Sequence, residues 1–202
     1  MRVLFIYPNV GAQIGFNYGV AYISAVLKQA GHQTALLDIN DKLGFGPDLE
    51  RIRAESERFD PDIICFSLLT NQFRLACEIA AYLRRHFRDV PFLAGGIHAT
   101  MAPEVTLETG LFDFLCVGEG EGASCELVDR LERGAETTRI RNIWYRDSDG
   151  TIHANPVRPF VSLDTLPIKD YEIFDFQRMI NAKDGWVGLM TSRGHYCLMI
   201  IK

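Results

Sequence analysis

The sequence predicts an α/β protein with a doubly wound parallel sheet of five strands and helices on both faces, of the flavodoxin-like or Rossmann-like type. Three observations support this fold class. Short apolar runs alternate with segments of helical period as far as residue 133. Glycine or proline separates many of these segments. Several apolar runs end in small or hydroxyl-bearing residues, and an open parallel sheet binds its ligands at such strand ends.

The first predicted strand is an apolar run, and the helix that follows it stops at Gly31, a residue that suits the end of a helix. Asp48 can stabilise the first turn of the second helix, and Pro61 separates that helix from the third strand. The predicted strands are residues 3–7, 34–38, 62–67, 91–94 and 113–117. The predicted helices are residues 18–30, 48–58, 71–87, 103–109 and 121–133.

The pattern changes after residue 139. Residues 142–146 and 151–154 flank a turn that ends in Asp149-Gly150, which predicts a small β-hairpin. Prolines then mark an extended connector. We therefore divide the chain into an α/β domain at residues 1–138 and a hairpin with a linker at residues 139–202.

Composition and charge exclude some classes of partner. The formal net charge is −5 and no dense run of Lys and Arg is present, so we expect no nucleic-acid partner. No apolar stretch approaches the roughly 18 residues of a membrane span and no secretory leader is recognisable, so we expect a cytoplasmic protein without a membrane partner. The five cysteines lack C-x-x-C spacing, and Cys65 and Cys116 are expected to be buried in strands.

Small and polar residues gather where the predicted strands end. The carboxyl ends of parallel strands share one edge of a sheet, so we expect these residues to form one cofactor site. Local alternatives are that Thr70 caps a helix, that His98 is a solvated loop residue and that the glycines only form tight turns. The candidate cofactor-binding residues are Asn9, Gly11, Gly15 and Asn17 after the first strand, Ser67, Leu69 and Thr70 after the third, Gly95, Gly96 and His98 after the fourth, and Gly118, Glu119, Gly120 and Glu121 after the fifth.

Residues 67–70, the Gly95-Gly96 pair and the Val-Gly-Glu-Gly-Glu turn at residues 117–121 together resemble a known family. They are similar to the N-terminal cobalamin-binding domain of cobalamin-dependent radical S-adenosylmethionine (SAM) enzymes, such as methyltransferases and the anaerobic Mg-protoporphyrin monomethyl ester cyclase. The resemblance implies a cobalamin cofactor, with Ser67 near the dimethylbenzimidazole of its nucleotide tail. It also implies that Gly96 leaves room for this tail, so a Gly96→Leu variant should fold and lose binding if the φ angle there is negative.

The loop after the first strand departs from one version of this fold. Corrinoid domains of the methionine synthase type hold Asp-x-His-x-x-Gly there, and the His is the lower ligand of cobalt. When that glycine is aligned with Gly15, Val10 occupies the Asp position and Ala12 the His position. The resemblance therefore implies a His-off cobalamin, and no protein metal ligand is expected.

Residues 189–194 resemble the segment that opens the catalytic barrel of the family, where a C-x-x-x-C-x-x-C motif follows and binds a [4Fe–4S] cluster. The matching positions here are His195, Met199 and Lys202, and Cys197 is out of register. We therefore expect that this chain alone holds no such cluster and does not cleave SAM. The radical SAM domain, in cis, would be absent or truncated. Whether the chain is an enzyme, its substrate, its upper cobalt ligand and its oligomeric state are left open.

Two readings without a corrin remain. A flavodoxin-like or receiver-type regulatory module would need an acidic cluster after the first strand and an Asp ending the third, where this chain has Pro8, Asn9 and Ser67. A Rossmann-type nucleotide binder would need G-x-G-x-x-G and a ribose-binding acid, for which Asp38 is the only candidate. Both alternatives are therefore disfavoured.

Overall fold

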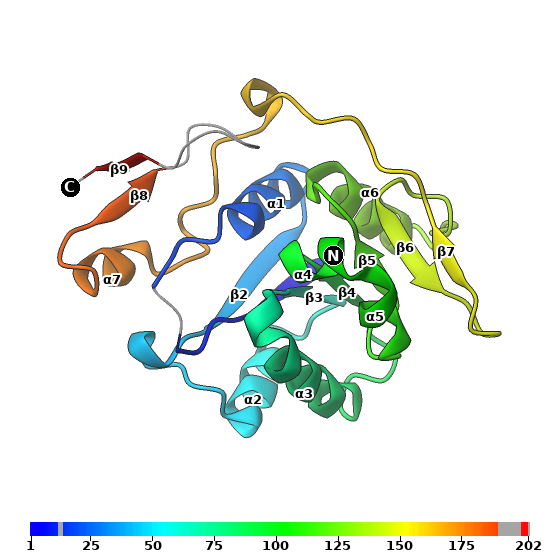
Figure 1. Ribbon diagram of the computed structural model, residues 1–202, viewed down its shortest axis with the longest axis horizontal. Helices are drawn as coiled ribbons and strands as arrows, with labels where there is room; N and C mark the ends of the chain where they lie inside the picture. The colour runs from blue at the N-terminus through cyan, green and yellow to red at the C-terminus, as the bar shows by residue number, and fades with distance from the viewer. Residues whose placement is uncertain (12–13, 190–198, 202) are drawn as a thin grey trace.

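The computed structural model describes residues 1–11, 14–189 and 199–201. Its main feature is one sheet in the order β2-β1-β3-β4-β5-β6-β7 (Figure 1). The first five strands are parallel, and all five were predicted. The strands are β1 (Arg2–Pro8), β2 (Gln33–Ile39), β3 (Ile63–Ser67), β4 (Phe92–Gly95), β5 (Phe114–Cys116), β6 (Ile143–Arg146) and β7 (Ile152–Ala154).

The sheet has seven strands and not the five predicted. The hairpin β6–β7 joins it, because β6 pairs antiparallel with β5, with Leu115 opposite Trp144. Ile143 of β6 is fully buried, so the hairpin contributes to the same core as the parallel strands. The division of the chain at residue 138 stays a prediction.

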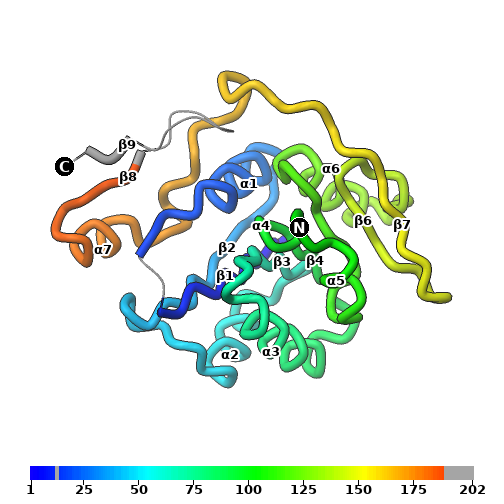
Figure 2. Tube along the Cα trace, viewed as in Figure 1, coloured from blue at the N-terminus to red at the C-terminus, as the bar shows by residue number. Residues whose placement is uncertain are grey.

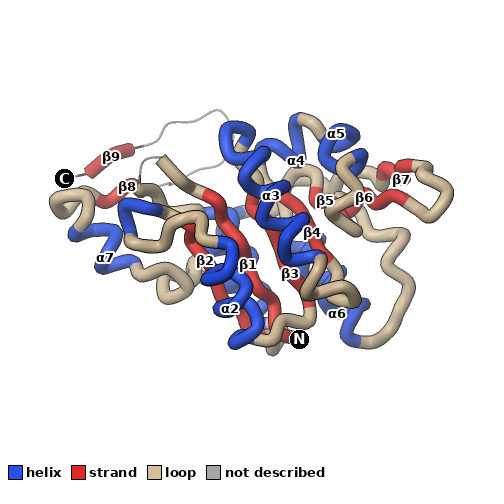
Figure 3. The backbone as a smooth tube through the Cα atoms, turned by 90° about the horizontal axis from the view of Figure 1, so that it is seen from below, coloured by secondary structure: helices blue, strands red, loops and turns tan. Residues whose placement is uncertain are grey.

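Helices cover both faces of the sheet, as predicted (Figures 1 and 3). On one face lie α1 (Tyr18–Gln29) and α6 (Glu121–Glu132), which pack against each other. The other face is covered by α2 (Leu49–Phe59), α3 (Phe73–Arg84), α4 (Ile97–Met101) and α5 (Pro103–Glu108). The sequence did not predict α4.

Alternating residues of the parallel strands form two separate cores. On β1, Phe5 faces α1 and α6, whereas Leu4 and Ile6 face α2 and α3. The same alternation continues on β3, where Cys65 belongs to the first core and Ile64 to the second. Burial on both faces explains why these strands are continuous apolar runs in the sequence.

Beyond β7 the chain returns across α6 and α1 (Figure 2). Arg158 pairs with Glu126 of α6, and further along the chain Asp170 accepts a hydrogen bond from Ser24 and pairs with Lys28, both on α1. We call residues 155–170 the connector. It leads to the short helix α7 (Phe176–Asn181) and to β8 (Val187–Leu189), which pairs with β9 (Met199–Ile201). Within the described residues, no helix is long and apolar enough to cross a bilayer.

Candidate cofactor-binding site

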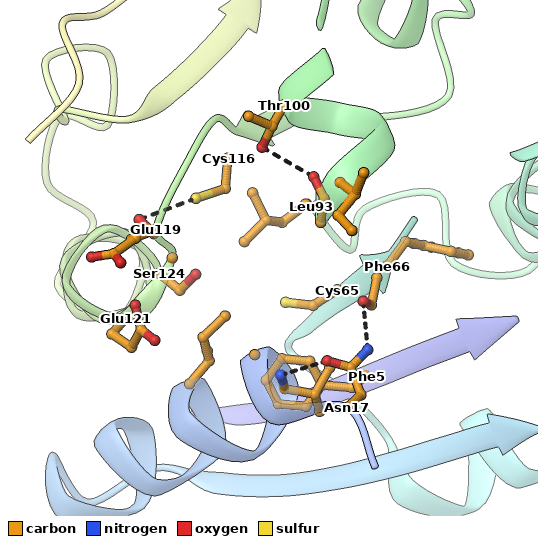
Figure 4. Close-up of a pocket in the computed structure, with 18 of the residues that line it drawn as sticks. Phe5, Asn17, Cys65, Phe66, Leu93, Thr100, Cys116, Glu119, Glu121 and Ser124 are labelled. Atoms are coloured by element: carbon orange, nitrogen blue, oxygen red, sulfur yellow. Dashed lines mark hydrogen bonds between the residues drawn. The ribbon is translucent and has the colours of Figure 1, made fainter. Parts of the chain in front are cut away.

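A cavity of about 630 Å³ runs from the C-terminal edge of the sheet inward beneath α1 and α6 (Figure 4). Its floor consists of inward-facing residues from four neighbouring strands, and its walls come from the first turns of the two helices. The lining is mostly apolar. The floor residues are Phe5, Cys65, Leu93 and Cys116.

The cavity lies at the position where the strand order reverses. β1 lies between β2 and β3, so the connections that leave β1 and β3 diverge and open a crevice at their carboxyl ends. Asn17, just before α1, and Ser67, at the end of β3, lie on either side of this crevice. Their side chains meet, because Asn17 Nδ2 donates a hydrogen bond of 2.9 Å to Ser67 Oγ.

The Gly95-Gly96 turn packs tightly on the neighbouring loop. The Leu68 N–H donates to Gly95 O at 2.8 Å, and the His98 N–H donates to Leu68 O at 3.1 Å. Gly96 has φ +94° and ψ −171°, a region open essentially only to glycine. A Cβ there would lie 2.9 Å from Leu68 O.

The expectation for Gly96→Leu is therefore wrong, because the φ angle is positive and the backbone of residue 68 fills the space next to it. The backbone, and not room for a ligand, requires glycine at residue 96. Gly95 is different: a Cβ there would make only ordinary contact, 3.6 Å from Cys116 Cβ, on the face that lines the cavity.

The turn of residues 118–121 forms the third side of the cavity mouth. Its Gly118 N–H donates to Thr100 Oγ1 at 3.0 Å, and the same hydroxyl donates to Gly96 O at 3.1 Å, so one side chain joins two of the turns. A Cβ at Gly120 would lie 2.8 Å from the end of Ile23, so the absence of a side chain lets α1 and α6 approach closely. Glu121 is buried in the first turn of α6 and lines the cavity.

The structure brings together eight of the predicted site residues and leaves six outside the cavity. The eight that line it are Asn17, Ser67, Gly95, Gly96, Gly118, Glu119, Gly120 and Glu121. The six that do not are Asn9, Gly11, Gly15, Leu69, Thr70 and His98.

Three of the six lie in the loop after β1. Asn9 is buried beside the end of β2, with its N–H donating to Ile39 O at 2.9 Å. The Gly11 N–H donates to Asp41, and Gly15 lines a smaller hollow next to α7. Ala12 lies outside the described residues, as do His195, Cys197 and Lys202; Met199 begins β9, and nothing is described of its side chain.

The other three lie on the opposite side of the strand ends. Leu69 precedes a single 3₁₀ turn that begins at Thr70, and no side chain caps this turn, so the N-cap alternative for Thr70 is wrong. His98 is buried and not solvated: its ring lies 3.9 Å from that of Phe73, and Nδ1 is 3.3 Å from Thr70 Oγ1. Desolvation lowers the pKa of His98.

Comparison with known proteins gives the family. A model described as "B12 binding domain" matches residues 9–128, which is more than half of the chain. The chain belongs to the B12-binding domain family. The family predicted from the strand-end motifs is thereby confirmed, and the receiver-type and nucleotide-binding alternatives are not favoured.

Curated relatives of this B12-binding domain are larger proteins. An uncharacterized methyltransferase of Pyrococcus horikoshii is 28% identical over 204 residues, which cover 96% of this chain and 43% of that protein. The anaerobic magnesium-protoporphyrin IX monomethyl ester cyclase of Cereibacter sphaeroides is 29% identical over 177 residues, 81% of this chain and 29% of that protein. The chain thus spans less than half the length of either relative.

Solved structures share the fold. The cobalamin-dependent SAM radical enzyme OxsB, with aqua-cobalamin and SAM bound, superposes with a TM-score of 0.74 at 19% identity, over 90% of this chain and 25% of that one. The radical SAM methyltransferase TsrM of Kitasatospora setae, with cobalamin and a [4Fe–4S] cluster bound, gives a TM-score of 0.64 at 20% identity, over 82% of this chain and 30% of that one.

Two thiols lie in the floor of the cavity in this B12-binding domain. Cys65 and Cys116 are buried, as predicted. Burial raises the pKa of the Cys116 thiol to about 12 and also raises that of Cys65. Both thiols therefore stay protonated at neutral pH, and this part of the floor is an uncharged surface suited to an apolar ring.

Several cavity residues were missed from the sequence. Val20 and Ile23 belong to the apolar face of α1. The sequence of this helix does not show that part of the face lines a cavity and is not covered by the sheet. Ile97, Thr100 and Met101 belong to α4, which is too short to show a helical period. Ile97 and Met101 are 65% and 77% exposed, and this exposure of apolar side chains at the cavity mouth was visible only in three dimensions.

The burial of Asp38 leads us to expect that the stability of the protein depends on pH. Asp38 pairs in register with Tyr7, its Oδ1 is buried without a partner, and burial raises its pKa to about 6. The higher pKa in the folded state stabilises the fold at pH values below the unfolded-state pKa of about 4. This contribution to stability is lost as the pH rises through the folded-state pKa of about 6. Asp38→Asn should therefore raise the free energy of unfolding by about 1–2 kcal/mol at pH 8 and change it little at pH 4. Urea titrations of both proteins at the two pH values measure this; an equal effect at both would contradict it.

Proposed function

We propose that this B12-binding domain binds cobalamin with the nucleotide tail in the cavity beneath α1 and α6 and the corrin ring at the C-terminal edge of the sheet. The observation that carries the proposal is the cavity itself. Its volume of about 630 Å³ falls within the range typical of small-molecule sites, and it opens where the strand ends meet. The eight predicted residues that line it are the proposed cofactor contacts.

The residues present fit such a tail. Phe5, Leu93 and Val20 offer an apolar surface for an aromatic base, and Ser67 offers a hydroxyl among them. Because Gly95 has no side chain, the space next to Cys116 stays open. The turns at residues 95–97 and 118–120 bring backbone groups to the mouth, where the amide side chains of a corrin need hydrogen-bond partners.

Cobalamin, when bound, supplies a cobalt centre that can carry a methyl group. The contribution of this chain is to hold the cofactor by its tail and to keep water from the buried base. We propose that it does so for a radical SAM domain in cis, which would bind SAM and the [4Fe–4S] cluster and carry out methyl transfer or cyclisation. The methyltransferase and cyclase relatives, of which this chain covers less than half, support this assignment.

Gel filtration with hydroxocobalamin tests the central proposal. Corrin absorbance should co-elute with the protein after free corrinoid is removed, at close to one equivalent per chain. Protein that elutes without corrin absorbance, even after incubation at tens of micromolar cobalamin, would refute it.

The bound cobalt should have no protein histidine as its lower ligand. His98 is the histidine predicted for the site, but it lies buried against Phe73 and does not line the cavity. Electron paramagnetic resonance of the cob(II)alamin form should therefore show no superhyperfine splitting from an imidazole nitrogen. The His98→Gln variant is the matched control, and its spectrum should be the same as that of the unaltered protein. Imidazole splitting that is lost in this variant would overturn the prediction.

A further inference from the structure

Asn17 joins the cavity to the first turn of α1. It is the N-cap of this helix, and its Oδ1 accepts a hydrogen bond of 3.1 Å from the Val20 N–H. Its Nδ2 donates a hydrogen bond of 2.9 Å to Ser67 Oγ (Figure 4). One amide group thus connects a helix terminus with the hydroxyl of Ser67, a residue that lines the cavity.

The helix cap fixes which way this amide points. An N-cap side chain must present an oxygen to the helix, because the N–H groups of the first turn have no partner within it. If the Asn17 amide were turned over, its NH₂ group would face the Val20 N–H, and two donors would be opposed. The cap therefore directs Oδ1 to the helix and Nδ2 to Ser67.

This orientation determines the role of the Ser67 hydroxyl. A hydroxyl has one proton to donate and two lone pairs. Ser67 Oγ uses a lone pair to accept from Asn17, which leaves its own proton to be donated elsewhere. Among the hydrogen bonds of the described residues, none uses this proton, and Ser67 lines the cavity.

We infer that Asn17 is a positioning residue that makes Ser67 a hydrogen-bond donor into the cavity, so that the domain selects a tail whose ring carries an unprotonated nitrogen. This rests on the proposed binding of cobalamin, whose dimethylbenzimidazole has such a nitrogen when it is not coordinated to cobalt. A tail that carries a phenol in place of the benzimidazole lacks this acceptor and leaves the Ser67 hydroxyl without a partner. Selectivity between the two tails is then set by a residue that need not touch the base.

The Asn17→Asp variant separates this role from helix capping. Aspartate is as good an N-cap as asparagine, so α1 should keep its first turn. Its second oxygen, however, has no proton to donate and accepts the proton of Ser67, which turns that proton away from the cavity. The probes are cobalamin and the cobamide that carries p-cresol in place of dimethylbenzimidazole, since both have the same corrin ring and a nucleotide tail with an aromatic base.

The unaltered protein should bind cobalamin about tenfold more tightly than the p-cresol cobamide, the worth of one hydrogen bond to a buried group. Asn17→Asp should reduce this ratio to near one by weakening cobalamin binding, with an unchanged unfolding temperature. Ser67→Ala, which removes the donor itself, should give the same ratio and serves as the second variant if Asn17→Asp is unstable.

The outcomes separate this inference from the proposed function. A ratio that stays near ten in either variant, or an equal loss of affinity for both cobamides, would overturn the role of Asn17. Failure of the unaltered protein to bind either cobamide would instead refute the proposed function.

Discussion

Replacing Gly95 by leucine is expected to abolish cobalamin binding in a domain that still folds. Gly95 ends β4 on the face that lines the cavity, opposite Ser67 of β3. A Cβ there meets Cys116 at an ordinary 3.6 Å, so the backbone accepts a side chain. The rest of a leucine side chain would extend into the space proposed for the tail. We expect the dissociation constant for cobalamin to rise at least about 100-fold, equivalent to roughly 3 kcal/mol.

Gly95→Ala is the matched control. A single methyl group occupies little of the cavity, so its affinity for cobalamin should fall by less than about tenfold. Equilibrium dialysis measures binding, and circular dichroism with urea denaturation shows whether each variant is folded. A folded Gly95→Leu variant with unchanged cobalamin affinity would place the ligand elsewhere.

Gly96→Ala is expected to affect stability and not only binding. Its φ of +94° with ψ −171° is strained for any residue with a Cβ, and that Cβ would lie 2.9 Å from the carbonyl oxygen of Leu68. Strain of this kind costs about 1–3 kcal/mol, and the displacement of the 67–70 loop adds to it. We expect the free energy of unfolding to fall by at least about 3 kcal/mol in urea denaturation.

Gly46→Ala provides the comparison for this variant. Nothing lies within 4 Å of a Cβ at Gly46, and its φ is outside the left-handed region, so this substitution should leave stability within about 1 kcal/mol of the unaltered protein. If Gly96→Ala were as stable as Gly46→Ala, the conformation of the Gly95-Gly96 turn described here would be wrong.

The central strands β1, β3 and β4 could be predicted because they are buried on both faces of the sheet. Such strands are unbroken apolar runs, and the first one, expected at residues 3–7, is observed as Arg2–Pro8. The edge of the sheet that holds the cavity followed from the same reasoning, since topology places the ends of parallel strands together. Ser67 and Gly95 therefore lie next to each other at this edge, as strand topology predicts, and their role in cofactor binding stays a prediction.

The features that escaped prediction depend on contacts distant in sequence. Asp149-Gly150 identifies a hairpin turn but not the strand beside which the hairpin will lie, so the pairing of β6 with β5 was not foreseen. The same holds for the glycine pair: the sequence does not distinguish the unstrained Gly95 from Gly96, whose φ is positive. His98 was expected in a loop, yet α4 places its ring against Phe73 of α3.

The connector ties together the two helices that wall the cavity, since Arg158 is anchored on α6 and Asp170 on α1. Between these anchors Phe160 is 91% exposed, so chymotrypsin should cleave after it while the sheet stays intact. Cleavage would remove a restraint on the separation of α1 and α6, and local opening would become more frequent. The cut protein should therefore release cobalamin faster than the intact protein, so that the residence time of the proposed ligand would depend in part on the connector.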